Sequence, residues 1–340
     1  MGKALTLLSL LFVLGCEAEE IGPQSSAGPS PPTRSASVLL INEGNFQRGN
    51  ASLGSYDPAL KQYAGGLYRA ANGNLPLGDV FQDMAYWQGR YYLTINNSGV
   101  VKILDSASFE QIGTINELSA PRFLTLAEDR LFITDLFTPN LWIIDPHSGV
   151  LDTVLRFRGA TGRLLRWDGQ IVQAVNNRLF LINPQKSSII DTLLFPGPLE
   201  RAFVDFHENL VILQQEGFFN AGLWRVDRDK QRKRLLSFPS GEEISLLTGH
   251  ASRPEFYFLR EGDLYRAAMS ADSLFGLRQW QELELMAPYG LNLDPFSGDV
   301  YLSEALDFDQ DSRIYRWNEA GEKLDEFTGG RITNGFYFRP

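Results

Sequence analysis

Arginines stand in three short polar stretches of the chain, between runs of residues that look like strands. The stretches "APR", "GATGR" and "GPLER" end at Arg122, Arg163 and Arg201. A guanidinium is a planar fork of donors that binds phosphate, carboxylate and amide oxygens. If the fold brings these stretches together, the sequence predicts a site for a ligand that carries such oxygens.

Aromatic and amide side chains occur in similar polar stretches. A phenylalanine in a polar loop is costly to leave in water unless something covers it. Large flat ligands favour an aromatic floor with a few convergent polar groups. The alternative is that the aromatics pack on neighbouring loops and the arginines pair with the abundant acids. The candidate ligand-binding residues are Asn45, Phe46, Arg48, Gln82, Asn97, Arg122, Phe137, Arg163, Arg201, Phe218, Tyr289 and Phe308.

The stretch "DFDQDS" resembles the start of a calcium loop. Asp307, Asp309 and Asp311 have the alternate spacing that such loops use to supply carboxylate oxygens. However, Ser312 stands where the turn glycine belongs, and Asn318 stands where the bidentate glutamate belongs. A solvated acidic loop is therefore the favoured interpretation, and no metal or cofactor is expected.

Catalytic motifs are missing from the sequence. Its three histidines, His147, His207 and His250, lie outside any nucleophile motif, and no P-loop or G-x-S-x-G elbow is present. Glu242 and Glu243 are adjacent, so on a strand they would point to opposite faces rather than act as a pair. The sequence predicts a binding protein, not an enzyme.

Strand-like pentads recur along the chain and indicate the fold. They are "LGSYD", "VKILD", "LWIID", "LFLIN", "LWRVD", "LYRAA" and "IYRWN", ending at positions 57, 105, 145, 183, 227, 268 and 318. Roughly 40 to 50 residues separate successive pentads, which is the length of a four-stranded propeller blade. The prediction is an all-β, seven-bladed β-propeller with four-stranded antiparallel blades. Its C-terminal strand, in "RITNGFYFRP", should complete the first blade and close the ring.

Strand direction alternates within a blade, so the loops between the second and third strands emerge on the same face as the links between blades. The phenylalanine-bearing loops, including "EGNFQRGN" at 43–50, belong to the first group. The stretches that carry Gln82, the three arginines, Tyr289 and Asn334 belong to the second. One face of the propeller should therefore collect all the candidates.

The N-terminal segment reads as an export and anchoring signal. Residues 1–15 combine an early lysine with a short apolar run, as in a signal peptide, and "VLGC" resembles a lipobox with Cys16 as the lipidated residue. Residues 16–36 are rich in Pro, Ser and Gly and should form a tether, which leaves 37–340 for the propeller. A net charge of −10 argues against a nucleic-acid partner.

Several stretches resemble the YncE-like propeller lipoproteins: "INEGNF", "NASLGSYDP", "LGDVFQDM", "YYLTINNSG", "ALDFDQDSRIYRWNEAGEKLDEF" and "GFYF". Members of that family accompany TonB-dependent transporters, and one captures vitamin B12. The resemblance implies a surface lipoprotein of the outer membrane that binds cobalamin or another corrinoid and passes it to such a transporter. The acidic "EAEE" after Cys16 resembles the signal for the outer face of that membrane. The alternative is a protein-interaction propeller that docks a transporter or another surface partner without a small ligand.

Overall fold

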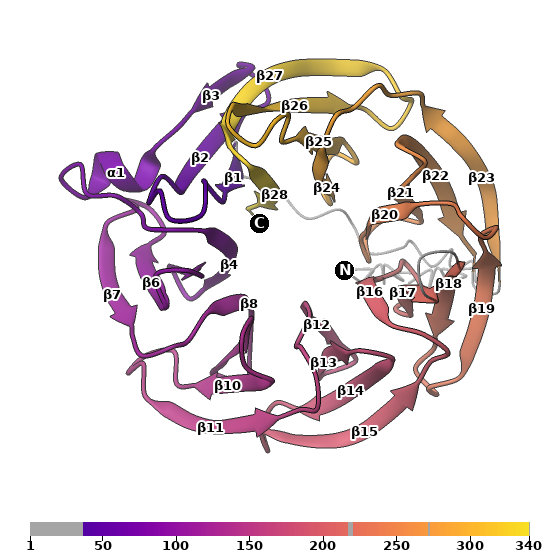
Figure 1. Cartoon of the computed structure of the whole chain (residues 1–340), viewed down its shortest axis with the longest axis horizontal. Helices are drawn as coiled ribbons and strands as arrows, with labels where there is room; N and C mark the ends of the chain where they lie inside the picture. Colours follow the sequence, from indigo (N-terminus) through magenta and orange to yellow (C-terminus); the bar gives the residue numbers. More distant parts are fainter. Residues whose placement is uncertain (1–36, 217–219, 271–272, 340) are drawn as a thin grey trace, which may run out of the picture. The chain divides into compact units, whose positions relative to one another are not determined.

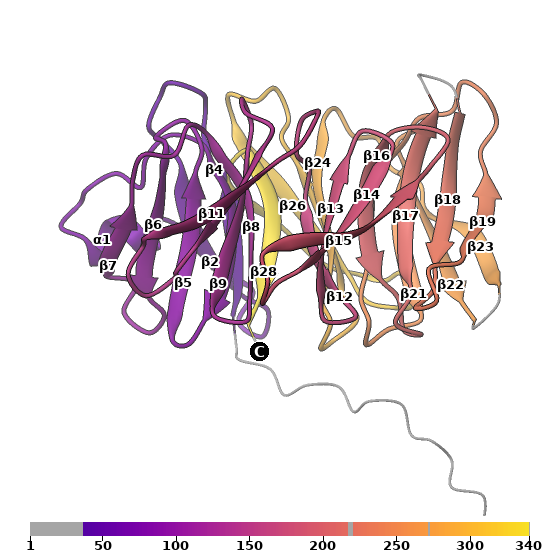
Figure 2. The same cartoon turned by 90° about the horizontal axis from the view of Figure 1, so that it is seen from below.

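The computed structural model describes residues 37–216, 220–270 and 273–339. In these residues, seven four-stranded antiparallel sheets surround a central axis (Figure 1). Each sheet is one blade, and its strands run between the two faces of the ring (Figure 2). The predicted all-β, seven-bladed propeller is confirmed. Residues 1–36, for which the sequence predicts a signal peptide, a lipidated Cys16 and a tether, lie outside the described residues.

The blades follow one another along the chain, and each runs from an innermost strand at the axis to an outermost strand at the rim. In that order, blade 1 contains β28 (Thr333–Phe338), β1 (Val38–Asn42), β2 (Ser52–Asp57) and β3 (Gln62–Ala64). Blade 2 contains β4 (Phe81–Trp87), β5 (Arg90–Ile95), β6 (Val100–Asp105) and β7 (Gln111–Ile115). Blade 3 contains β8 (Pro121–Ala127), β9 (Arg130–Asp135), β10 (Asn140–Ile144) and β11 (Leu151–Arg156). Blade 4 contains β12 (Leu164–Trp167), β13 (Gln170–Val175), β14 (Arg178–Asn183) and β15 (Ser188–Leu194).

The other three blades have the same order. Blade 5 contains β16 (Leu199–Val204), β17 (Leu210–Glu216), β18 (Asn220–Val226) and β19 (Arg232–Ser237). Blade 6 contains β20 (Ile244–Gly249), β21 (Glu255–Arg260), β22 (Asp263–Met269) and β23 (Leu274–Gln281). Blade 7 contains β24 (Pro288–Leu293), β25 (Val300–Glu304), β26 (Asp311–Trp317) and β27 (Lys323–Arg331). The pentads found in the sequence lie along the third strands.

The second strands form the core of the ring because neighbouring blades cover both of their faces. Every residue of β1 and of β25 is buried, and β5 and β9 are buried after their first residue. A strand buried on both faces reads as a continuous apolar run rather than an alternating one. The runs "VLLIN" and "VYLSE" have this character.

The C-terminal strand closes the ring, as the sequence predicted. β28 pairs with β1 in antiparallel register, with Phe338 opposite Val38 and Phe336 opposite Leu40. The Phe336 ring is buried, and its centre lies 5.3 Å from the centre of the Tyr301 ring in blade 7. Both ends of the propeller domain therefore belong to one sheet, and β28 is its inner strand (Figure 1).

One element was not foreseen. A short helix, α1 (Leu67–Ala71), follows β3 and is the one α-helix of the described residues. Tyr68 is its buried residue, and its hydroxyl accepts a 2.6 Å hydrogen bond from Lys102 Nζ. The stretch is too short to show a helical period in the sequence. None of the described residues forms a helix long and apolar enough to cross a membrane.

Candidate functional site

The innermost strands begin at one face of the ring with irregular pairing. In four blades the regular ladder skips a single residue near this start: Gln82 in β4, Glu200 in β16, Tyr289 in β24 and Asn334 in β28. Related register shifts occur in β8 and β20. A bulge of this kind frees one residue from the alternation of the strand and re-aims its side chain. Here the four skipped residues all line one cavity at the axis of the ring.

A cavity of about 460 Å³ lies at this end of the axis. Six residues that were predicted to lie in the links between blades line it, and they come from six different blades. They are Gln82, Arg122, Arg163, Arg201, Tyr289 and Asn334. The expected convergence of these stretches is therefore present in the structure. A second cavity of about 250 Å³ continues from the first and shares Gln82, Arg163, Arg201 and Asn334 with it.

One side of the cavity is a closed hydrogen-bond network around Glu43, which follows β1. Oε1 of its carboxyl accepts hydrogen bonds from Gln82 Nε2 and Asn334 Nδ2, both at 2.7 Å, and Oε2 accepts one from the Tyr289 hydroxyl at 2.9 Å. We call these four residues, Glu43, Gln82, Tyr289 and Asn334, the amide wall. Glu43 is only 8% exposed, and this burial raises the pKa of its carboxyl despite the three donors and the nearby Arg122.

Glu43 was not among the residues predicted from sequence, although it stands within the "EGNFQRGN" loop. The available signal was an acidic side chain placed directly after a wholly buried strand. Glycine also helps to build this wall. A Cβ at Gly290 would lie 2.7 Å from the backbone oxygen of Asn334, so the absence of a side chain lets β24 and β28 approach closely.

The other side of the cavity is cationic. Arg122 in β8, Arg163 immediately before β12 and Arg201 in β16 come from blades 3, 4 and 5, and we call them the arginine wall. The guanidinium carbons of Arg122 and Arg163 lie 4.9 and 4.5 Å from the centre of the Phe123 ring. Cations over an aromatic face are attracted by its quadrupole, so Phe123 helps to hold both side chains. Phe123 is a second contributor that was not predicted from sequence.

The arginine wall has few partners for its charges. Among the described residues, none of these three guanidinium groups forms an ion pair within the protein. The Nε atom of Arg122 is buried and has no hydrogen-bond partner in the described part of the chain. Burial and the neighbouring Arg163 lower the pKa of Arg201 to about 9, and the same two causes lower that of Arg122.

Asp83 lies in the wall of the second cavity. Its carboxyl accepts hydrogen bonds from the backbone N–H groups of Leu124 at 3.1 Å and Met84 at 3.0 Å, so it links β4 to β8 of the next blade. Loss of hydration raises the pKa of Asp83 to about 6, although Arg163 and the two backbone donors act in the opposite direction. This carboxyl is a further residue that was not predicted from sequence.

The predicted phenylalanines do not line the cavity. Phe46 and Phe137 are 62% and 72% exposed, and they lie on loops of the same face. Phe308 packs edge-on against Tyr289, with their ring centres 5.8 Å apart. It therefore supports the amide wall from outside. Phe218 lies outside the described residues.

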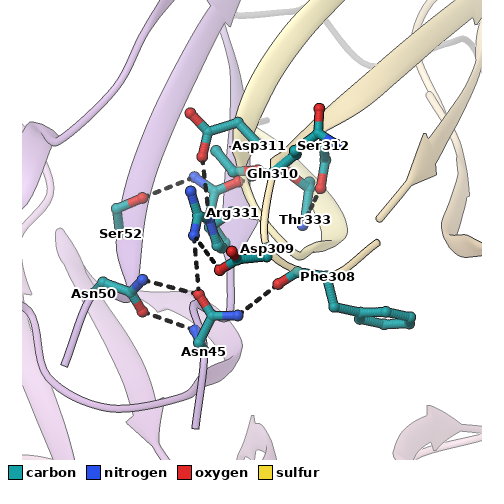
Figure 3. Close-up of polar contacts among 12 residues, drawn as sticks. Asn45, Asn50, Ser52, Phe308, Asp309, Gln310, Asp311, Ser312, Arg331 and Thr333 are labelled. Atoms are coloured by element: carbon teal, nitrogen blue, oxygen red, sulfur yellow. Dashed lines mark hydrogen bonds and ion pairs between the residues drawn. The ribbon is translucent and has the colours of Figure 1, made fainter. Parts of the chain in front are cut away.

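Asn45, Arg48 and Asn97 are also absent from the cavity lining. Asn45 joins the loops of blades 1 and 7: its Nδ2 donates to the backbone oxygen of Phe308 at 2.5 Å, and its Oδ1 accepts from Arg331 and Asn50. Figure 3 shows this arrangement, with the Phe308 ring pointing away from it. Asn97 donates to Asp79 at 2.6 Å. The backbone N–H of Arg48 donates to Asn45 within its own loop. Asn45 and Asn97 thus hold loops together.

The three aspartates of the possible calcium loop do not converge. Asp307 accepts hydrogen bonds from the backbone N–H groups of Asp309 and Gln310, which closes a turn. Asp309 and Asp311 instead form ion pairs with Arg331 (Figure 3). Within the described residues, no group of three or more acidic, histidine or cysteine side chains is placed to hold a metal ion.

Comparison with known proteins places the chain by fold and by family. Solved structures with the same fold include a quinonprotein alcohol dehydrogenase-like protein from Bacteroides thetaiotaomicron, which is 13% identical with a TM-score of 0.72 over 89% of this chain and 78% of that one. A protein from Lactobacillus plantarum is 10% identical, with a TM-score of 0.70 over 90% and 99% of the two chains. A functionally unknown protein from Desulfotomaculum acetoxidans is 9% identical, with a TM-score of 0.68 over 89% and 99%.

At these identities the similarity concerns the fold alone. A search of curated protein sequences found no match. A family model described as a domain of unknown function, DUF5074, matches residues 36–205, which is half of the sequence. The chain belongs to the DUF5074 family of propeller domains.

Proposed function

We propose that this propeller captures a small molecule in the cavity at the end of its axis and holds it without transforming it. The observation that supports this function is the convergence of Gln82, Tyr289, Asn334 and the arginine wall, from six blades, on one cavity. Polar side chains that a fold gathers in one concave site, with hydrogen-bonding capacity left over, are typical of ligand recognition.

A corrinoid such as cobalamin is the ligand we propose, on the strength of the resemblance in the sequence. A cavity of about 460 Å³ admits part of such a molecule, so the flat ring would lie across the mouth. The side-chain amides and the phosphate of cobalamin would then reach the amide and arginine walls. Phe46 and Phe137, exposed on the same face, offer apolar surface for the ring.

The cellular role that we propose follows from the same resemblance. Lipidated at Cys16 and tethered by residues 17–36, the propeller would stand at the outer surface of the outer membrane. It would pass its ligand to a TonB-dependent transporter. The long tether would let the cavity face approach the transporter.

Calorimetric titration of the purified protein with cyanocobalamin tests this function. We expect saturable binding, with a loss of affinity in an Arg122→Gln variant. The matched control is Lys186→Gln, which removes the same charge from an exposed turn between β14 and β15. The proposal fails if wild type shows no binding of cyanocobalamin at micromolar concentration.

The second candidate, a docking surface for a protein partner, is favoured by the apolar rim. Leu136, Phe137 and Phe46 remain exposed on the loops of the cavity face. A Phe46→Ser, Phe137→Ser double variant separates the two functions. Loss of binding to the purified transporter with unchanged affinity for cyanocobalamin would assign the rim to docking. Loss of cyanocobalamin affinity would assign it to the ligand.

A further inference from the structure

The arginine wall gathers three arginines around one cavity without an acid that forms an ion pair with them in the described residues. Some other arginines do pair with acids, as Arg260 does with Glu242 at 2.7 Å and Arg266 with Glu255 at 2.9 Å. Arg122, Arg163 and Arg201 make no such pair with the described residues. Their charges are instead gathered around one cavity.

Three carboxyl groups act electrostatically on the arginine wall, and two of them already accept hydrogen bonds from other groups. Glu43 acts electrostatically on Arg122, but its two oxygens accept hydrogen bonds from the other members of the amide wall. Asp83 acts on Arg163, but its oxygens accept backbone N–H groups. Glu200 acts on Arg201 and is itself exposed to solvent. None of the three carboxyl groups forms an ion pair with these arginines in the described chain.

Mutual repulsion makes this grouping unfavourable for the protein alone. Burial lowers the pKa of both Arg122 and Arg201, and the charge of Arg163 lowers both values further. Like charges side by side in a partly dehydrated site cost free energy unless an anion offsets them. A buried Arg122 Nε atom that lacks a partner in the described residues adds an unused donor to the same site.

We infer that the arginine wall is the binding site for a phosphate group of the ligand. This inference rests on the proposed function, because it names the chemical group that the proposed cavity recognises. Three arginines from three successive blades line the cavity. A phosphate has several acceptor oxygens in a tetrahedral arrangement and can accept from all of them. A carboxylate carries one charge and its acceptor oxygens lie in one plane, so it matches three converging guanidinium groups less well than a phosphate does.

Calorimetry with inorganic phosphate as the probe, on the purified full chain, tests the inference. We expect saturable binding that weakens as salt is added. Arg163→Gln and Arg201→Gln should each weaken phosphate binding roughly tenfold or more, because each removes charge-assisted hydrogen bonds. Lys186→Gln should leave the affinity unchanged, and acetate should bind more weakly than phosphate. Phosphate binding that is absent from wild type, or equal in wild type and both arginine variants, would overturn the inference.

Thermal unfolding distinguishes a lost site from a misfolded variant. In phosphate-free buffer, Arg201→Gln should unfold at the same temperature as wild type or a higher one, since it relieves repulsion with Arg163. Phosphate should raise the midpoint of wild type by mass action and leave that of Arg201→Gln almost unchanged. An equal rise in both proteins would contradict a site at the arginine wall.

Two corrinoids separate this inference from the proposed function. Cyanocobalamin carries a phosphodiester, and dicyanocobinamide lacks it. We expect Arg163→Gln to weaken binding of cyanocobalamin and to leave binding of dicyanocobinamide unchanged. If phosphate binds and neither corrinoid does, the ligand is not a corrinoid, but the phosphate site is still supported. If both corrinoids bind and the arginine variants change neither affinity, the phosphate site is wrong and the capture function stands.

Discussion

The amide wall and the arginine wall line the same cavity, but their polar groups are bonded in opposite ways. In the amide wall, Glu43 accepts three hydrogen bonds and the network is closed within the protein. In the arginine wall, Arg122 and Arg163 share Phe123 as an aromatic neighbour, and none of the three arginines forms an ion pair with the described residues. A buried polar group stabilises a fold only when it is satisfied, so the first wall serves the scaffold. The guanidinium groups of the second wall keep hydrogen-bond donors that a ligand could use.

The largest effect on stability should come from shortening β28, the strand that closes the ring beside the amide wall. Deleting residues from Phe336 onward removes most of the pairing between β28 and β1 and the contact of Phe336 with Tyr301. Loss of a single buried phenylalanine already costs about 3–5 kcal/mol, and this deletion also leaves β1 as an open edge. We expect the cooperative unfolding transition of the whole domain to be lost, as measured by circular dichroism. Unchanged thermal unfolding would show that the ring does not depend on this strand.

Removal of the central acceptor should have the next largest effect. Glu43→Ala leaves the Gln82 and Asn334 amides and the Tyr289 hydroxyl without their shared partner. Buried donors left in this way cost on the order of 1–3 kcal/mol each before relaxation. We expect a lower midpoint of urea unfolding, with Glu43→Gln as the control because it keeps the shape and one acceptor oxygen. If the two variants are equally stable, the amide wall contributes packing rather than hydrogen bonds.

Asp83 should make stability depend on pH. Its pKa of about 6 in the folded protein lies above the ordinary value of 3.8, so the folded state holds the proton more tightly than the unfolded chain. The resulting stabilisation is complete below about pH 4 and is lost as the pH rises through 6, by no more than about 3 kcal/mol. Urea unfolding of wild type and Asp83→Asn between pH 4 and pH 7 measures this. The difference in free energy of unfolding between the two proteins should change over that pH range. A constant difference would show that Asp83 does not make stability depend on pH.

The smallest effect on stability should come from the rim. Phe137 is 72% exposed, so Phe137→Ser removes little buried surface. We expect the free energy of unfolding to change by about 0.5 kcal/mol or less, as for other exposed positions. A large loss of stability in urea unfolding would mean that Phe137 belongs to the scaffold, like the amide wall, and not to a surface for binding.

The repeat was readable from sequence because each blade carries its own local pattern. The pentads, the surplus strand at the end and the links that carry Arg122, Arg163 and Arg201 all follow from that pattern. The amide wall was only partly readable. Gln82, Tyr289 and Asn334 were identified, but Glu43, their common partner, stands at the end of an apolar strand and resembles an ordinary loop residue. Its role depends on contacts between residues that are far apart in the chain.

Glu43 was missed as a site residue, whereas some loop residues were wrongly predicted to line the site. Asn45 and Asn97 were expected to meet a ligand because polar and aromatic groups gather in those loops. In the structure their amides bind Phe308, Arg331 and Asp79. Position on a face can be inferred from strand order, whereas the direction of a side chain depends on the bulges and on neighbouring loops. Neither leaves a clear signal in one sequence.

Closure of the ring by β28 also governs when the domain can be finished. β1 is made long before its inner partner β28, so blade 1 cannot have all four strands until β28 has been made. Pairing between such distant segments is slow, because a long loop must close before the contacts form. During that interval β1 exposes an edge that β28 of another copy can occupy. Refolding at high protein concentration is thus the condition under which two chains would exchange their β28 strands.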